Sequence, residues 1–254
     1  MRKIGLYITF ALALLPSLCF AQGHFYTTKE RLQDYGSKIT KVVLPGNIVL
    51  DRLLQQGVSE LWQVTPYEFC TEQEYEALKS KPQYFFLRMV TLQDSGKKDS
   101  GVVCLSLSKG GGKNRESRDA AAHFLNVPVM SSAAMVTALD EACFPAYLSI
   151  VQQYIIDGAE SERIANVGLL SYSGNILKSR HFNISFDERE SIAMLQNSTL
   201  GGAVAVVVQP LDASSESYYY HYVIGTEDKA LYFYSRKKNA PEFTSFELKL
   251  LKKE

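Results

Sequence analysis

Residues 39–61 read ITKVVLPGNIVLDRLLQQGVSEL, and this stretch decides what kind of fold to expect. Its first part, Ile39 to Leu44, has the length and the β-branched side chains of a buried strand, and Pro45-Gly46 ends it. Asn47 can then cap a helix whose apolar residues recur every three or four positions as far as Leu61. A buried strand that leads into an amphipathic helix is the unit from which helix-covered sheets are built.

Strand and helix patterns continue to alternate along the chain. Helices are predicted to open at the capping boxes Thr27-x-x-Glu30, Thr71-x-x-Glu74 and Ser185-x-x-Glu188, and further strands are predicted at Trp62–Thr65, Tyr84–Leu92, Gly101–Ser108 and Ala203–Val208. A wide apolar stripe predicts a long helix from Met135 to Tyr154, with a bend at Pro145 and a stop at Gly158.

The last part of the chain predicts an antiparallel hairpin, with strands at Ser217–Ile224 and Ala230–Ser235. The tail from Phe243 fits two patterns, because Thr244-x-x-Glu247 is a capping box whereas the apolar residues beyond it also alternate as in a strand; we favour the helix. The predicted fold class is α/β, with a mostly parallel or mixed central sheet covered by helices and a C-terminal antiparallel hairpin. That sheet is expected to contain the strands at residues 39–44, 84–92 and 203–208, with the long helix packed across it.

The composition is that of a globular protein without a strong electric field. The chain has 254 residues, of which 46% are hydrophobic and 21% charged, and Lys+Arg and Asp+Glu number 27 each. This balance excludes the low hydrophobicity and high net charge of disordered chains, and it offers no overall attraction to nucleic acid. We expect a single α/β domain over residues 22–254, with a possible internal boundary near residues 109–119.

Residues 1–21 have the pattern of a signal peptide. Arg2 and Lys3 precede an apolar run that is too short to cross a bilayer, and small residues before Gln22 form a cleavage site. We therefore expect cleavage between Ala21 and Gln22, and a periplasmic or extracellular mature protein. No later stretch is long and apolar enough to predict a transmembrane segment in the mature chain.

Cysteine and histidine spacing predicts neither a redox motif nor a metal site. After cleavage three cysteines would remain, Cys70, Cys104 and Cys143, so that at most one disulfide could form. Cys104 and Cys143 lie in apolar patterns that favour burial, whereas Cys70 precedes a helix N-terminus that could lower its pKa. The histidines lie far apart and show no metal-ligand spacing, and we expect no cofactor.

Three polar motifs could carry chemistry, and each has a simpler interpretation. Lys109 to Asn114 is glycine-rich but departs from a Walker phosphate loop, so we interpret it as a solvent-exposed loop. Ser171 to Gly174 lacks the Gly-x-Ser-x-Gly nucleophile pattern. The four glutamates at 68, 72, 74 and 76 fit a solvated helix face better than a pair of catalytic carboxylates.

The hairpin is rich in tyrosine and supplies the candidate ligand-binding residues. Because alternate residues of a strand share a face, the rings could form an aromatic platform for a saccharide or a peptide. The residues of this platform are Tyr218, Tyr220, Tyr222, Tyr232 and Tyr234. Tyrosine also favours half-buried strands, and we expect the rings to pack under helices rather than to bind a ligand.

Three segments of the sequence resemble known families of proteins. The leader ending Phe20-Ala21-Gln22, together with Val43–Asp51 and Trp62–Phe69, resembles uncharacterised exported α/β proteins of Bacteroides-type bacteria. The strand–helix–strand layout is similar to the N-terminal domain of TolB-like envelope proteins, although no propeller repeats follow. This resemblance implies a setting at the cell envelope and assigns no catalytic residue.

The sequence thus favours an exported, non-enzymatic protein that acts at the cell envelope through contacts with a protein or a small ligand. The alternative is a secreted hydrolase or transferase whose catalytic residues are dispersed along the chain.

Overall fold

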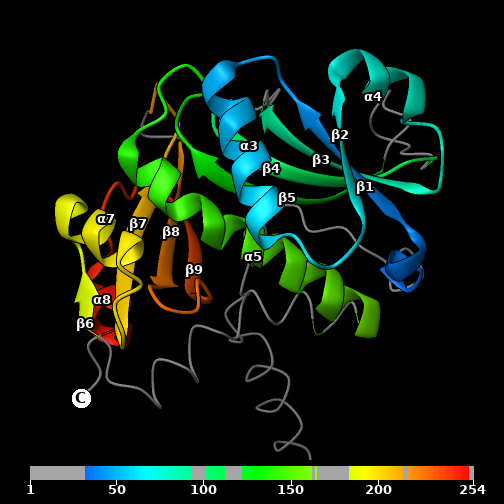
Figure 1. Ribbon diagram of the computed structural model, residues 1–254. Coiled ribbons are helices and arrows are strands. Elements are labelled where there is room, and N and C mark those ends of the chain that lie inside the picture. The colour runs from blue at the N-terminus through cyan, green and yellow to red at the C-terminus, as the bar shows by residue number, and fades with distance from the viewer. Residues whose placement is uncertain are drawn as a thin grey trace, which may run out of the picture.

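The computed structural model describes residues 32–92, 101–111, 122–161, 164, 183–213 and 217–251, and Figure 1 shows their arrangement. The described chain forms two mixed β-sheets, of five and four strands, with helices packed on both. The predicted α/β class is therefore confirmed. The capping box predicted at Thr27 lies outside the described residues.

The first sheet has the strand order β2-β1-β3-β4-β5. Its strands are β1 (Ile39–Leu44), β2 (Tyr67–Thr71), β3 (Tyr84–Thr91), β4 (Val103–Lys109) and β5 (Ala122–Met130). Strand β1 runs parallel to both β2 and β3, whereas β3, β4 and β5 follow one another antiparallel. Strands β4 and β5 are neighbours in this sheet although the possible boundary at 109–119 lies between them in sequence.

The second sheet has the strand order β6-β7-β8-β9. Its strands are β6 (Asn183–Ser185), β7 (Gly202–Val208), β8 (Tyr218–Gly225) and β9 (Leu231–Lys238). Strand β6 is parallel to β7, and the other pairs are antiparallel. The hairpin predicted at the end of the chain is β8–β9, and it is confirmed.

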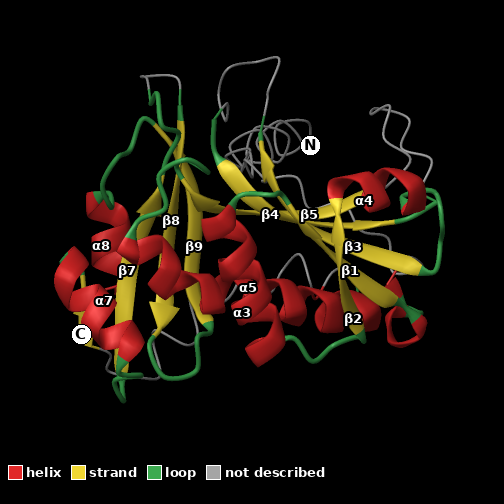
Figure 2. Cartoon of the chain, turned by 45° about the horizontal axis from the view of Figure 1, so that its top comes forward, coloured by secondary structure: helices red, strands yellow, loops and turns green. Residues whose placement is uncertain are grey.

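Helices cover both faces of the sheets (Figure 2). They are the short 3₁₀ helix η2 (Tyr35–Ser37) and the helices α3 (Ile48–Leu61), α4 (Glu72–Leu78), α5 (Ala138–Glu160), α7 (Glu188–Gln196) and α8 (Ser245–Leu251). In Figure 2, α3 and α5 lie on one side of the first sheet and α4 lies on the other. The tail is helical, as expected.

Local capping chemistry starts most of these helices where the sequence predicts. The Asn47 side chain accepts hydrogen bonds from the N–H groups of Val49 and Leu50, and Thr71 forms a complete capping box with Glu74. Helix α7 is the exception. Its N-cap is Asp187 rather than Ser185, because the Asp187 carboxylate accepts from the backbone N–H of Glu190.

Two strand predictions are wrong. Residues 62–65 form a loop, because the Trp62 ring turns into the core and its N–H donates to the Thr65 hydroxyl at 3.0 Å. Strand β2 comes later, at Tyr67. The strand at 203–208 is buried as predicted but lies in the second sheet, since its partners are β6 and β8.

Helix α5 contains the predicted apolar stripe but has different ends. Its capping box is Thr137 with Asp140, so Met135 precedes the helix and is 66% exposed. The helix continues through Pro145 and past the buried Gly158 to Glu160. The predicted stop at Gly158 is wrong, because the helix continues through this buried glycine.

One apolar core joins α5 to both sheets. Its members include Val127 and Val129 of β5, Val204 and Val206 of β7, and Tyr147, Val151 and Ile155 of α5. Helix α3 approaches α5 closely at Gly57, where an added Cβ would lie 2.8 Å from Leu148 Cδ1 and 2.9 Å from Phe144 Cε1. This close approach leaves a shallow groove along the outer side of the two helices.

Tyr222 connects the two sheets directly. Its hydroxyl donates to the carbonyl of Pro128 at 2.9 Å, at the edge strand β5 of the first sheet. Its ring packs edge to face on Tyr147 of α5 and also contacts Tyr234 of β9. Tyr222 is only 1% exposed, so this hydroxyl satisfies a carbonyl that water cannot reach.

Removing the Tyr222 hydroxyl should therefore destabilise the protein. We expect Tyr222→Phe to lower the free energy of unfolding by about 1–3 kcal/mol, because the buried Pro128 carbonyl loses its donor while the ring still packs. Chemical denaturation measures this change. Tyr218→Phe is the matched control on the same strand, with an expected change within about 0.5 kcal/mol. Equal effects of the two variants would contradict the role of the Tyr222 hydroxyl.

Candidate functional site

The five tyrosines proposed as a binding platform are not exposed. Tyr220, Tyr222 and Tyr232 are buried, with 2%, 1% and 3% of their surface accessible, and Tyr218 and Tyr234 are partly buried. The rings pack in or against apolar clusters of the core, as expected for structural tyrosines, and among the described residues of the hairpin they form no open aromatic platform. The Arg236 guanidinium also covers the Tyr218 ring, at 3.6 Å from its centroid.

A buried cluster of polar side chains lies between β8, β9 and α8. His221 is completely buried, and its Nδ1 lies 3.1 Å from both carboxylate oxygens of Glu247. Ser235 also donates to Glu247, and Thr244 donates to it through both its hydroxyl and its backbone N–H. On its other side, His221 Nε2 lies 2.8 Å from the carbonyl oxygen of Ala240.

This cluster contains the residue types of a catalytic triad but not the geometry. In a triad the serine hydroxyl bonds to the histidine, and the acid orients the opposite ring nitrogen. Here Ser235 bonds to Glu247, and the second nitrogen of His221 faces a backbone carbonyl. Both ring nitrogens face acceptors, so the ring serves to hold α8 and the segment before it against the second sheet.

The electrostatic environment of Glu247 stabilises its charged form. Burial alone would raise its pKa, but hydrogen bonds from His221, Ser235 and Thr244 outweigh burial and lower the pKa to about 2. A carboxyl group whose pKa is lowered by folding stabilises the folded state above its unfolded pKa, and this contribution disappears as pH falls toward the folded value.

We expect Glu247→Gln to destabilise the protein by about 3 kcal/mol at neutral pH, because it removes the charged partner of a buried group. The difference from the unchanged protein should shrink as the pH falls from about 4.5 toward 2, as the carboxyl of the unchanged protein takes up a proton. Thermal unfolding of the variant and of the unchanged protein over this pH range measures the difference in stability. The exposed residue Glu242 provides a control through Glu242→Gln, and a pH-independent difference would contradict the assignment.

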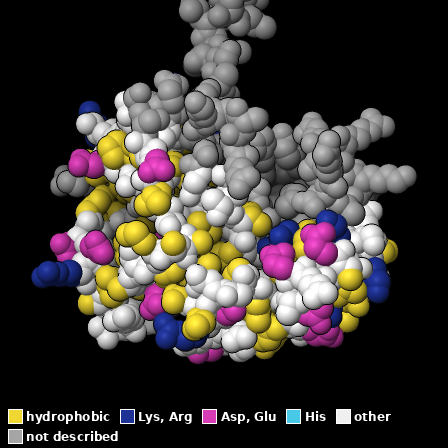
Figure 3. Space-filling view, turned by 90° about the horizontal axis from the view of Figure 1, so that it is seen from above, with side chains coloured by type: hydrophobic (Ala, Val, Ile, Leu, Met, Phe, Trp, Pro, Cys, Tyr) yellow, Lys and Arg dark blue, Asp and Glu magenta, His cyan; other side chains and the backbone are white. Residues whose placement is uncertain are grey.

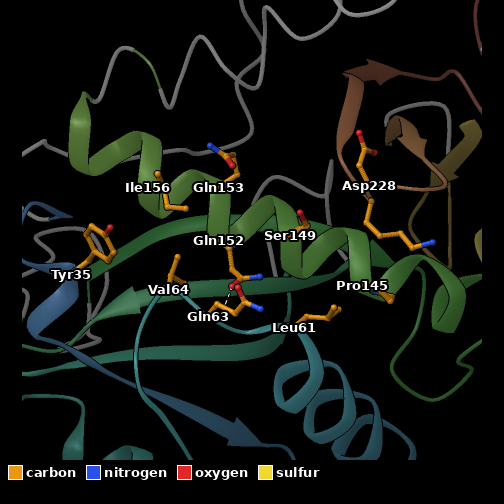
Figure 4. Close-up of a pocket in the computed structure, with 11 residues that line it drawn as sticks. Tyr35, Leu61, Gln63, Val64, Pro145, Ser149, Gln152, Gln153, Ile156 and Asp228 are labelled. Atoms are coloured by element: carbon orange, nitrogen blue, oxygen red, sulfur yellow. Dashed lines mark hydrogen bonds between the residues drawn. The ribbon is translucent and has the colours of Figure 1, made fainter. Parts of the chain in front are cut away.

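An open groove lies on the outer side of α5, formed by two hollows. The first has a volume of about 550 Å³ and is shown in Figure 4. Its lining residues are Tyr35, Leu61, Gln63, Val64, Pro145, Ser149, Gln152, Gln153, Ile156, Asp228 and Lys229. They come from η2, from the end of α3 and the loop after it, from α5, and from the β8–β9 turn. In Figure 4, Gln152 points from α5 toward Gln63, whose backbone N–H donates to Gln152 Oε1 at 2.7 Å.

The second hollow, of about 530 Å³, lies between α3, the first half of α5 and the end of α7. Both hollows include Pro145 and Lys229, so they meet at these residues. We call the two hollows together the α5 groove. Each hollow has the size of an ordinary small-molecule site, and the residues around the groove include both polar and apolar side chains.

The charged side chains around the α5 groove are bonded within the protein. Lys229 donates to the carbonyls of Leu195 and Thr226, at 2.7 and 2.5 Å. Arg52 lies 3.3 Å from Glu141 in an ion pair. Burial lowers the pKa of Lys229, which matches a lysine that serves as a structural donor near the end of α7.

The cysteines are buried free thiols. Cys70, Cys104 and Cys143 are all free and buried, and the burial of Cys104 and Cys143 agrees with their apolar sequence patterns. Burial raises the pKa of Cys143 to about 12 and that of Cys70 to about 11. The possibility that the helix N-terminus activates Cys70 is therefore wrong, because desolvation dominates at this thiol.

The acidic cluster is accounted for by ion pairs and by capping. Glu68 pairs with Lys41, Glu72 with Arg88, and Glu76 with Lys79, while Glu74 completes the α4 capping box. These contacts spread the carboxylates over β2 and α4 instead of pairing them. Catalysis by two neighbouring carboxylates has no support in this arrangement.

The first residues of the glycine-rich segment, Lys109 to Gly111, are held by an ion pair and by backbone hydrogen bonds. Lys109 pairs with Asp34 at 3.1 Å, and the N–H groups of Gly110 and Gly111 donate to the carbonyls of Tyr84 and Lys79. The rest of this motif, from residue 112, lies outside the described residues, as does the serine motif at 171–174.

Sequence patterns did not reveal the α5 groove. Ser149, Gln152 and Gln153 are polar positions in a long apolar helix and resemble any solvated helix face. Gln63 follows α3 in a segment predicted as a strand. Only the packing of α3 beside α5 brings these side chains together, and no local motif signals it.

Within the described residues, no group of three or more His, Cys, Asp or Glu side chains is placed to hold a metal ion. Among the described helices, none has both the length and the apolar character needed to cross a membrane.

Comparison of the chain with protein-family models, with curated proteins and with solved structures finds no match.

Proposed function

We propose that this chain is an exported, non-enzymatic protein of the cell envelope that binds a ligand or partner in the α5 groove. The groove carries the proposal. It runs beside a long helix and combines a partly apolar floor at Leu61, Val64 and Pro145 with polar side chains from several elements. Concave sites of this mixed character are typical of binding surfaces.

Export is supported by the leader pattern of residues 1–21 and by the resemblance to exported proteins of Bacteroides-type bacteria. The layout shared with the N-terminal domain of TolB-like proteins supports a place at the envelope. Cleavage between Ala21 and Gln22 would release the mature chain to the periplasm or the exterior.

The alternative, a secreted hydrolase or transferase, has less support. A covalent mechanism needs a nucleophile within hydrogen-bond reach of a base. The buried cluster at His221 brings a serine, a histidine and an acid together, but its serine bonds to the acid instead of the histidine.

The export part is tested by intact-mass measurement of the protein recovered outside the cytoplasm. We expect a chain that begins at Gln22, because the small residues before it suit the signal peptidase. Replacing Leu12 and Leu14 by arginine should abolish export by breaking the apolar run, while Lys3→Arg, which keeps the charge, should leave export unchanged. A retained leader would overturn this part of the proposal.

The binding part is tested by blocking the groove. The mature chain is applied to arrays of immobilised saccharides and peptides, and bound ligands are retested with Ser149→Trp, which places a large ring in the groove. We expect at least a tenfold loss of affinity. Gln73→Trp, at an exposed position on α4 across the first sheet, is the control and should bind normally. Absence of any ligand sensitive to Ser149→Trp would overturn the proposed site.

A further inference from the structure

We infer that the ligand of the α5 groove is a neutral saccharide chain, an inference that rests on the proposed function of this groove. Four features of the groove support it: the hydrogen bonds that its charged groups already make within the protein, the kind of polar groups it presents, the aromatic ring at one end, and its length. Each of these features limits, by a separate argument, the class of ligand that the groove can bind.

The charged groups Lys229, Asp228 and Glu60 of the groove already make hydrogen bonds within the protein. Lys229 donates to two carbonyls, and Asp228 accepts from the N–H of Ala230 and the hydroxyl of Tyr232. At the second hollow, Glu60 accepts from Gln56. A charged ligand would have to compete with these bonds, whereas a neutral ligand would not. On the face shown in Figure 3, basic and acidic side chains are likewise interspersed.

The remaining polar groups can both donate and accept. The oxygen of the Gln152 amide accepts from the N–H of Gln63, which leaves the NH₂ group of Gln152 as a donor to a ligand. Ser149 lies one helical turn earlier on α5 and lines the same hollow, as does the Gln63 amide. Neighbouring hydroxyls of a sugar ring require such paired donors and acceptors.

Tyr35 adds an aromatic ring at the end of the groove away from Pro145, as Figure 4 shows. The face of a pyranose ring is apolar while its rim carries hydroxyls, so a tyrosine ring beside amide groups complements both parts. Tyr35 is partly exposed and is held in η2, next to Asp34, whose carboxylate pairs with Lys38 and Lys109.

A peptide fits the groove less well. Peptides commonly bind by adding a strand to a sheet edge or by placing an apolar helix face in an apolar groove. The walls here are helices and connecting loops rather than a sheet edge, and glutamines interrupt the apolar floor. A nucleic-acid ligand would require a row of basic side chains along the groove. Here acidic and basic residues line the groove together, and Arg52 is already paired with Glu141.

The length of the groove indicates a chain rather than a single sugar. Its lining residues on α5 extend from Ala138 to Ile156, which is about 27 Å at the rise of an α-helix. Several sugar units in a row could therefore contact Tyr35, Gln152 and the second hollow at once. Affinity should grow with the number of units until this length is filled.

The test is isothermal titration calorimetry of the mature chain with defined probes. They are linear neutral oligosaccharides of two to eight units (cello-, malto- and xylo-series), an oligogalacturonate, and an uncharged Gly-Ser peptide of similar length. We expect at least one neutral series to bind, with affinity that rises with chain length, and weaker binding of the oligogalacturonate and the peptide.

Two variants examine the contacts. Gln152→Glu keeps an oxygen for the Gln63 N–H but removes the donor, and we expect about a tenfold loss of saccharide affinity. Tyr35→Ala should cause a similar loss by removing the ring. Gln55→Ala, at an exposed position on α3 outside the groove, is the control. An unchanged unfolding midpoint shows that each variant is folded.

The outcomes separate this inference from the proposed function. Failure of every neutral oligosaccharide to bind, or binding that Gln152→Glu and Tyr35→Ala leave unchanged, overturns the saccharide inference. Tight binding of the peptide that Ser149→Trp abolishes also overturns it but leaves the binding function of the groove standing. Saccharide binding lost in both groove variants and kept in the control supports it.

Discussion

The packing of α5 against both sheets at once is the constraint on which the rest of the structure depends. A helix of 23 residues that buries Cys143, Tyr147 and Ile155 needs apolar partners on more than one side. The first sheet supplies them through β5 and the second through β7 and β8. Helix α3 packs beside α5, and it can approach closely only because Gly57 carries no side chain. The α5 groove is the outer surface of this arrangement.

Much of the fold follows from local chemistry. The caps at Asn47, Thr71 and Thr244 each satisfy backbone N–H groups within their own helical turn, so the sequence alone predicts where those helices begin. Strands β1, β3 and β7 are recognisable because burial on both faces requires continuous apolar residues. The errors have a different origin. The strand at 203–208 pairs with its neighbours in sequence, β6 and β8, rather than with the strands of the first sheet, and its own apolar residues do not encode that choice.

The elements that sequence reasoning missed have mixed patterns. Strand β5 contains Asn126 and Pro128, which weaken a strand prediction, and a proline is tolerated there because β5 is an edge strand. The groove residues were missed because a glutamine on a helix surface looks the same whether or not another element lies beside it. The buried contact between His221 and Glu247 joins residues 26 positions apart. It forms only because α8, which follows the hairpin in the chain, packs back against β8 and β9.

Among the described strands β5 lies at an edge of the first sheet, and this has a consequence for how the protein behaves at high concentration. An unpaired strand edge offers N–H and C=O groups to other chains and can nucleate intermolecular β-sheet aggregation. Pro128 has no N–H to offer, and its carbonyl already accepts the Tyr222 hydroxyl. Together with the neighbouring second sheet, these two residues remove part of the template that another copy of the chain would need. We therefore expect the contact that joins the two sheets also to disfavour pairing of another copy of the chain at this edge.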